Sequence, residues 1–346
     1  MRIIACQTPL HFLVASFILE KSTRDNILFW IEESNISEDF VSVLWGNCCR
    51  KIIKVPGAGK IEGKFDRTIQ KFRNVRQIKK NINEIKARCN SKITELYIFN
   101  DNSPETQCLM HCAARDGGKI YLGEDGVAIY DIGGLFRVNL ANKWIGKLIY
   151  GLWWDPQKRM GLSRKISIIY AFYPNCVRRD ILDFKKILAI PELNYDNYKN
   201  IINSLRLPLI DITDAIVWVV PLSTETKSEK INCFLEELIL SEGKAILKFH
   251  PRENERFIQN LKIRLQDKIF YEFPKELPVE ILFLQKSQAV KIIGCGSSAL
   301  HIVKKINENV QVFHLNYNNE DSAIDNWREF YETIGVKCFY VKENCS

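Results

Sequence analysis

The sequence lacks any apolar run long enough to cross a bilayer, any Cys-x-x-Cys pair and any internal repeat. A membrane-spanning helix needs about 20 mostly apolar residues, so we expect no such span. The eleven cysteines are scattered, and the adjacent Cys48 and Cys49 are not the framework of a secreted scaffold. Gln7, Pro9 and His11 interrupt the apolar start of the chain, unlike a secretory signal. These absences predict a cytoplasmic protein with reduced thiols.

The composition that is present is that of a globular protein, with 346 residues, 46% hydrophobic and 26% charged. This is enough for two domains with sizeable cores. Lys and Arg number 49 against 41 Asp and Glu, a formal charge of +8 that favours anionic partners such as nucleotides, acidic sugars, nucleic acid or lipid headgroups. Cys108, His111 and Cys112 can share a helix face, but a metal site there would lack a fourth ligand, so we interpret them as part of a packed helix.

Apolar runs alternate with amphipathic segments, which is typical of parallel strands covered by helices. We predict a first Rossmann-like domain over residues 1–155, a linker over 156–212, a second Rossmann-like domain over 213–320, and a C-terminal helix and tail over 321–346. Ligands of open parallel sheets bind beyond the carboxyl ends of the strands. The predicted fold class is therefore α/β, with two Rossmann-like domains facing a central cleft.

The loop Glu124-Asp125-Gly126 directly follows the predicted strand 119–123. Two adjacent carboxylates make it costly to ionise both, which raises a pKa and lets one of them take a proton from an alcohol. One carboxylate would then be a general base and the other its support. The alternative is an acidic turn in which Gly126 supplies the backbone freedom.

A second loop places His250 and Pro251 after a predicted strand, between Lys248 and Arg252. A histidine in this position can donate a hydrogen bond to a departing phosphate. The flanking cations would raise the affinity for an anion and lower the pKa of the histidine. The alternative is a structural or surface histidine.

A third loop has the sequence GCGSS and lies between a predicted strand and a predicted helix. Ser297 and Ser298 stand at the start of that helix, where backbone N–H groups and hydroxyls form an anion site suited to phosphate. The alternative is that Ser297 only caps the helix. Neither the G-x-G-x-x-G nor the G-x-x-x-x-G-K-[ST] nucleotide pattern is present.

Taken together, the three motifs resemble bacterial sialyltransferases of glycosyltransferase family 52 and the related families 38 and 80 in their order and in the elements that carry them. The opening TPLHFLVA is similar to the first strand and helix of the family-52 enzymes. The segment LPVEILFLQ is similar to the stretch that carries a ribose-binding glutamate, which is Glu280 here. The resemblance runs from residue 1 to about residue 315 and is confined to these motifs.

The resemblance implies a GT-B fold and an inverting transfer of sialic acid from CMP-sialic acid, without a metal or other cofactor. The expected acceptor is a hydroxyl, such as that of a galactoside, on a lipopolysaccharide, O-antigen or capsule. Asp125 takes the place of the general base, Glu124 supports it, and His250 assists the departing phosphate. The residues expected to bind CMP are Ser297, Ser298, Glu280, Pro251, Arg252 and Gly296. His11 and Asn102 are expected to contact the acceptor or the sugar.

The segment 143–165 matches no motif and mixes Trp144, Trp153 and Trp154 with lysine and arginine. Such a mixture is typical of an interfacial membrane segment, and it suits an interdomain or homodimer contact equally well. We therefore expect a cytoplasmic enzyme and leave open peripheral binding to the inner face of the cytoplasmic membrane.

Two other functions stay open at this point. One is a GT-B transferase that uses a different nucleotide sugar. The other is a nucleic-acid-binding protein that exploits the charge of +8. Because no aromatic and basic recognition motif is present, we expect no nucleic-acid partner.

Overall fold

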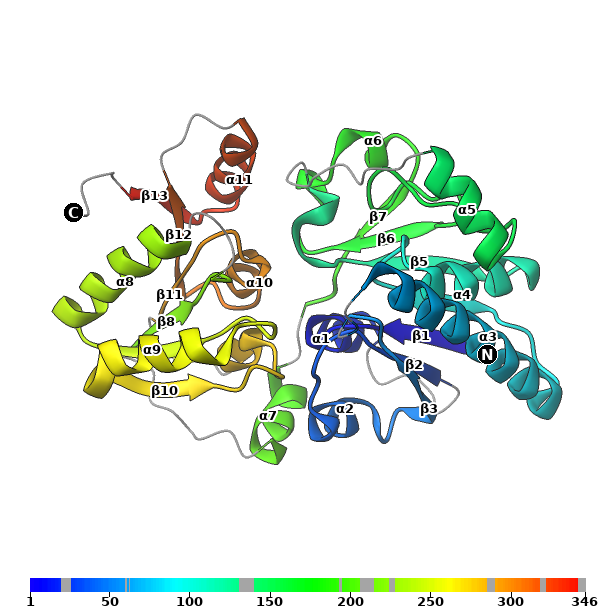
Figure 1. Ribbon diagram of the computed structural model, residues 1–346, viewed down its shortest axis with the longest axis horizontal. Coiled ribbons are helices and arrows are strands. Elements are labelled where there is room, and N and C mark those ends of the chain that lie inside the picture. The colour runs from blue at the N-terminus through cyan, green and yellow to red at the C-terminus, as the bar shows by residue number, and fades with distance from the viewer. Residues whose placement is uncertain are drawn as a thin grey trace. The chain divides into compact units, whose positions relative to one another are not determined.

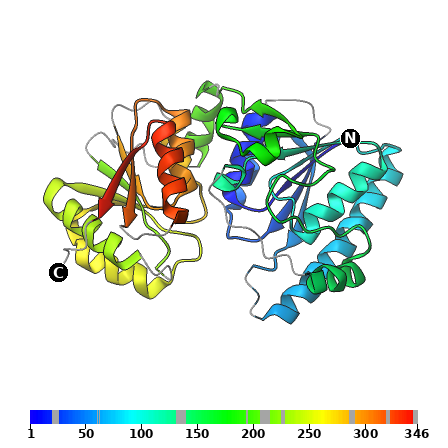
Figure 2. The same ribbon diagram turned by 90° about the horizontal axis from the view of Figure 1, so that it is seen from above.

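The computed structural model describes residues 1–19, 26–59, 61, 63–130, 140–192, 195–205, 215–223, 228–284, 290–317 and 322–341. The chain forms two compact units, Met1–Pro191 and Glu192–Ser346. Each unit is a twisted parallel sheet between helices (Figure 1, Figure 2). The prediction of two α/β domains is therefore confirmed.

The sheet of the first unit has seven strands in the order β3-β2-β1-β4-β5-β6-β7, and every neighbouring pair is parallel. The strands are β1 (Arg2–Cys6), β2 (Asn26–Glu32), β3 (Cys49–Pro56), β4 (Glu95–Ile98), β5 (Lys119–Gly123), β6 (Ile168–Ala171) and β7 (Lys186–Ala189). The segment NILFWIE of β2 is buried except at its last residue. Such near-continuous burial is what a strand covered on both faces requires.

Helices cover both faces of this sheet. They are α1 (Pro9–Ile18), α2 (Glu38–Trp45), α3 (Lys64–Cys89), α4 (Pro104–Arg115), α5 (Leu140–Tyr150) and the short α6 (Arg179–Leu182). Helices α1 and α2 pack together, and α3 packs against both α4 and α5. Thr8, Ser37 and Ser103 cap α1, α2 and α4, each accepting a bond from a backbone N–H in the first turn.

The order of the strands reverses between β1 and β4, because β1 is followed in sequence by β2 on one side and has β4 on its other side. Loops diverge at such a point and leave a crevice beyond the carboxyl ends of the strands. In the first unit, the loops that leave β1 and β4 flank the reversal, and β5, which carries the next loop, is the neighbour of β4.

The sheet of the second unit has six parallel strands in the order β10-β9-β8-β11-β12-β13, with its reversal between β8 and β11. The strands are β8 (Ala215–Val219), β9 (Lys244–Lys248), β10 (Ile269–Phe273), β11 (Lys291–Gly294), β12 (Gln311–Tyr317) and β13 (Lys337–Val341). The helices are α7 (Tyr195–Ser204), α8 (Ser228–Glu242), α9 (Glu255–Leu265), α10 (Ser298–Ile306) and α11 (Ser322–Thr333). Trp218, Leu247 and Phe249 are fully buried in its core.

The boundaries differ from those predicted. The first unit continues to Pro191 because β6 and β7 join the first sheet beside β5, so most of the predicted linker 156–212 belongs to that unit. Each of these strands has only four residues, and both follow the irregular segment 143–165, which interrupts the alternation of strands and helices. The predicted tail within 321–346 contains β13, which pairs with β12. Residues 193–194 and 206–214 lie outside the described residues.

Candidate functional site

Asp125 follows β5 and faces His11 of α1. His11 Nε2 lies 2.9 Å from Asp125 Oδ1, and the side chains are 2% and 28% exposed respectively. The histidine ring stacks on Phe99, with 5.0 Å between the ring centroids. The Asp125 carboxylate is thus partly exposed to solvent and contacts a buried imidazole.

The protonation of His11 follows from its other nitrogen. The backbone N–H of Gln7 donates to His11 Nδ1 at 3.1 Å, so Nδ1 is an acceptor. The proton of the neutral ring is then on Nε2, the atom that faces Asp125. We predicted His11 as a contact to the acceptor, but the buried ring instead contacts Asp125 and can position its carboxylate.

Gly123, the last residue of β5, makes this arrangement possible. A Cβ at position 123 would overlap the ring of Phe99. Phe99 can therefore lie over the end of β5, and His11 stacks on its ring. Glycine often occurs in a strand where another group approaches the backbone this closely.

The side chain of Glu124 points away from this site into the core. It is fully buried, and Glu124 Oε2 accepts bonds from the hydroxyl of Tyr130 and from the backbone N–H of Phe172, the latter at 2.7 Å. The backbone N–H of Tyr173 donates to the Tyr130 hydroxyl at 3.2 Å. The two adjacent carboxylates therefore have different surroundings, and Glu124 ties the loop after β5 to the end of β6.

We expect Glu124→Ala to lower the free energy of unfolding by about 2–5 kcal/mol, because it leaves two buried donors without their acceptor. Asp125→Asn is the matched control, because the Asp125 side chain is partly exposed and the amide keeps an oxygen that can face the buried His11 Nε2. It should cost no more than about 1 kcal/mol. Denaturant unfolding of both variants measures the difference, and equal losses would contradict an anchoring role for Glu124.

Sequence reasoning missed the contact between Gln7 and Ser103. Gln7 Nε2 donates to Ser103 Oγ at 3.1 Å, which joins the loop after β1 to the start of α4 across the reversal point of the sheet. Ser103 Oγ also accepts from the backbone N–H of Thr106 at 3.2 Å. The only sequence signals are a polar residue after a strand and a serine before a proline.

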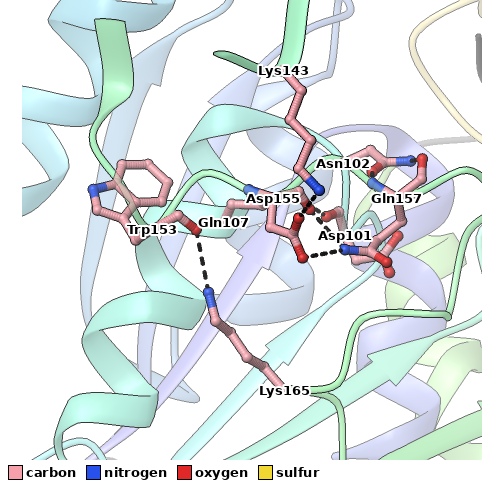
Figure 3. A network of polar contacts seen from close by, with 8 residues as sticks. All are labelled: Asp101, Asn102, Gln107, Lys143, Trp153, Asp155, Gln157 and Lys165. Carbon is pink, nitrogen blue, oxygen red and sulfur yellow. Dashed lines mark hydrogen bonds and ion pairs between the residues drawn. The ribbon is translucent and has the colours of Figure 1, made fainter. Parts of the chain in front are cut away.

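Asn102 belongs to a network that fixes residues 155–163 (Figure 3). Its Nδ2 donates to the carbonyl of Gln157 at 3.3 Å, and its Oδ1 accepts from the Gln157 N–H at 2.7 Å. Asp101 Oδ2 accepts from the N–H groups of Gly161 and Ser163. Burial raises the pKa of Asp101 to about 6, against the effect of these two bonds. The contacts of Asn102 are thus to the backbone of its own unit.

In the second unit, His250 follows β9 and is half-buried. The backbone N–H of Arg252 donates to His250 Nδ1 at 3.1 Å, which leaves Nε2 to carry the proton. Burial, followed by the charges of Arg252 and Lys248, lowers the pKa of His250. The ring is therefore a neutral N–H donor at neutral pH, held by the turn that includes Pro251.

Lys248 has a different role from the one its position suggested. Its ammonium is buried and donates to three main-chain carbonyls at 2.7–3.0 Å, those of Pro274, Lys275 and Leu277. Burial lowers the pKa of Lys248 to about 7, and its three bonds hold the loop after β10 in place of binding an anion. Arg252 is exposed.

Ser297 and Ser298 begin α10 as predicted. Ser297 Oγ accepts from the N–H of Ala299 at 3.3 Å, so Ser297 caps α10, and the anion site at this helix start stays a prediction. Gly296 has φ +57°, the left-handed region that favours glycine. The Tyr331 hydroxyl donates to the carbonyl of Ser297 at 2.8 Å and fixes the turn from behind. Both serines are partly exposed at the helix N-terminus.

Glu280 lies on the 3₁₀ turn Val279–Leu284, which packs against α10. Its side chain is buried, and burial raises its pKa, with Lys248 and His301 of α10 acting in the opposite direction. The 3₁₀ turn that carries Glu280 therefore packs against α10, the helix that Ser297 caps.

Sequence reasoning also missed Glu253. Its carboxylate accepts from the N–H and hydroxyl of Ser223 at 2.8 and 2.6 Å, and from the N–H of Asn254 at 2.7 Å. These bonds connect the loop after β8 with the loop that carries His250.

A comparison with models of protein families matches residues 2–316 to the alpha-2,8-polysialyltransferase (POLYST) family. The chain belongs to this family. No curated protein matches it.

Solved structures resemble this polysialyltransferase-family chain in fold. The UDP-GlcNAc 2-epimerase of Methanocaldococcus jannaschii, in complex with UDP-GlcNAc and UDP, is 13% identical and has a TM-score of 0.55, covering 99% of this chain and 90% of its own. A UDP-glucosyltransferase from Polygonum tinctorium is 10% identical and has a TM-score of 0.52, covering 97% and 84%. The predicted GT-B fold class is confirmed.

The family match and the fold support a glycosyltransferase of the sialyltransferase type. The resemblance to glycosyltransferase family 52 stays a prediction. Within the described ranges of this polysialyltransferase-family chain, no group of three or more His, Cys, Asp or Glu side chains could hold a metal ion. In the same ranges, none of the helices combines the length and apolar character that a membrane crossing needs.

Proposed function

We propose that this chain transfers sialic acid, with inversion, from CMP-sialic acid to a hydroxyl of a bacterial surface glycan. The observation that carries the proposal is the partly exposed Asp125 carboxylate, held by His11 beyond the carboxyl end of β5 in a polysialyltransferase-family chain. In this proposal Asp125 accepts the proton of the acceptor hydroxyl as that oxygen attacks the anomeric carbon. His11 positions Asp125 and does not itself contact the sugar.

The second unit would bind the donor. Ser297, Ser298 and the N-terminus of α10 would hold the CMP phosphate, with Gly296 allowing the close approach. His250 would donate its Nε2–H to the phosphate as the bond to the sugar breaks. Glu280 would accept bonds from the ribose hydroxyls, and Pro251 and Arg252 would border the nucleotide. These groups would stabilise the departing phosphate without a metal.

The direct test is incubation of the full chain with CMP-sialic acid and a panel of galactosides and sialylated galactosides, with and without excess EDTA, followed by mass spectrometry. We expect sialylated products that persist in EDTA. Transfer that disappeared with EDTA and returned with magnesium or manganese would overturn metal independence. Absence of transfer to every acceptor, with CMP-sialic acid intact, would contradict the proposal.

A second candidate is transfer from a different nucleotide sugar. It is favoured by one observation, that the similar structure from Methanocaldococcus jannaschii is a complex with UDP-GlcNAc and UDP. The same acceptor panel with UDP-sugars separates the two, because only one donor class should be consumed.

We expect the double variant Ser297→Ala/Ser298→Ala to weaken CMP binding by about 10- to 100-fold or more, because two hydroxyl contacts to a charged group are lost. Cytidine binding should change little, since cytidine has no phosphate. Glu280→Gln is the matched control and should weaken CMP and cytidine alike. Calorimetry measures both ligands, and equal weakening of CMP and cytidine by the double serine change would place the phosphate elsewhere.

A further inference from the structure

Helix α5 presents large apolar side chains to solvent. Trp144, Ile145 and Leu148 are 63%, 52% and 86% exposed, and Leu152, just beyond the helix, is 84% exposed. These four residues are named the α5 apolar face. Trp144, Ile145 and Leu148 fall within about 100° of the helix circumference, and Leu152 follows the end of the helix. Exposed aromatic and leucine side chains in one cluster mark an interaction surface.

The opposite side of α5 is packed within its own unit. A Cβ at Gly146 would overlap the indole of Trp154, and Tyr150 lies 5.3 Å from the Trp154 ring. Trp153 in turn stacks on His111 of α4 at 5.8 Å. One side of α5 therefore packs against Trp154, and the α5 apolar face is exposed to solvent.

The surroundings of this face are strongly basic. Residues 140–165 contain six Lys and Arg against the single acid Asp155, a net charge of +5. Lys147 Nζ lies 5.1 Å from the Trp144 ring, and Lys158 and Arg164 are exposed. Lys143 pairs with Asp155 at 2.6 Å, and Arg159 pairs with Asp180 at 3.8 Å.

The positive charge around the α5 apolar face distinguishes two possible partners, a second copy of the chain and a lipid surface. In a symmetric dimer the same patch meets itself, so each copy would place its net charge of +5 against the other. An anionic lipid surface has the opposite charge and attracts each nearby lysine or arginine. A helix of 11 residues is too short to span a bilayer and would lie in the interface with its apolar side inserted.

We propose that the α5 apolar face inserts into the headgroup region of an anionic bilayer, with the surrounding lysines and arginines contacting the lipid phosphates. This binding needs no substrate and does not rest on the proposed transfer reaction. It would hold the first unit at the membrane as a peripheral protein.

The test is sedimentation of the full chain with vesicles of phosphatidylcholine, with and without phosphatidylglycerol. We expect binding to the anionic vesicles and little to the neutral ones. Trp144→Ala/Leu148→Ala/Leu152→Ala should weaken binding by about tenfold or more. The matched control is Phe184→Ala/Leu240→Ala/Ile263→Ala, which removes three exposed apolar side chains elsewhere and should change binding less than about twofold.

A second variant separates charge from apolar insertion. Lys147→Gln/Lys158→Gln should lower the affinity for anionic vesicles about fivefold per charge removed and should leave the neutral vesicles unaffected. Analytical ultracentrifugation without vesicles gives the oligomeric state. Equal binding by the apolar triple variant and the wild type, or a wild-type dimer that this variant converts to a monomer, would overturn the proposal.

Discussion

Asp125→Asn is expected to lower the rate of sialyl transfer by about 10²- to 10⁴-fold, the usual contribution of a general base. The amide keeps the shape of the side chain beside His11 but cannot accept the proton of the acceptor hydroxyl. Because Asp125 is partly exposed, its replacement should leave the melting temperature close to that of the wild type. Initial rates, together with CMP affinity by calorimetry, measure the effect.

The neighbouring carboxylate supplies the control for this experiment. Glu124→Gln keeps an oxygen that can accept from Phe172 and Tyr130, and its side chain does not reach the site that Asp125 faces. It should therefore retain a far higher rate of transfer than Asp125→Asn. Any decrease in its rate should be explained by a lower free energy of unfolding. A near-normal rate for Asp125→Asn would place the base elsewhere in the chain.

His250→Ala is expected to lower the rate of transfer by about 10²-fold or more while weakening CMP binding less than tenfold. Its contact strengthens only as the phosphate gains charge in the transition state, so the ground-state complex loses little. Single-turnover rates compared with the CMP Kd separate the two effects. A loss confined to CMP affinity would make His250 a simple binding residue.

The pH dependence follows from the tautomer of His250. Its pKa is lowered, and Nδ1 already accepts from Arg252, so the ring is neutral with a proton on Nε2 at neutral pH. Raising the pH from about 7 to 8 does not remove that proton, and the rate should not fall over this range because of His250. A fall that His250→Gln abolished would show that the imidazolium form is required.

Much of the fold could be predicted because its strands are strongly patterned. The run at 26–32 is apolar and buried almost throughout. Strands of this kind alternate with helices, and the residues Thr8 and Ser103 stand at helix starts as N-caps. The loops with Asp125, His250 and Ser297 could be found for the same reason, since each directly follows a recognisable strand. Strands β6 and β7 gave no comparable signal, because they follow the irregular segment 143–165, which interrupts the alternation of strands and helices.

The details of the candidate site could not be predicted because they depend on contacts between distant residues. Consecutive residues at the end of a strand point to opposite sides, but sequence does not say which side is the core. Only the structure shows that Glu124 turns inward and Asp125 outward. The bond between Gln7 and Ser103 spans 96 positions, and the three carbonyls that hold Lys248 belong to another loop.

Strand β13 has a consequence for how the end of the chain should be treated. It pairs with β12 from Phe313 to Tyr317, so these residues of β12 do not form the edge of the second sheet. A protein shortened before Lys337 would leave the N–H and C=O groups along that side of β12 without partners. Unpaired edges of this kind recruit strands from other molecules. Residues 337–341, which resemble a dispensable tail in sequence, therefore keep this side of β12 paired and make β13 the edge of the second sheet in its place.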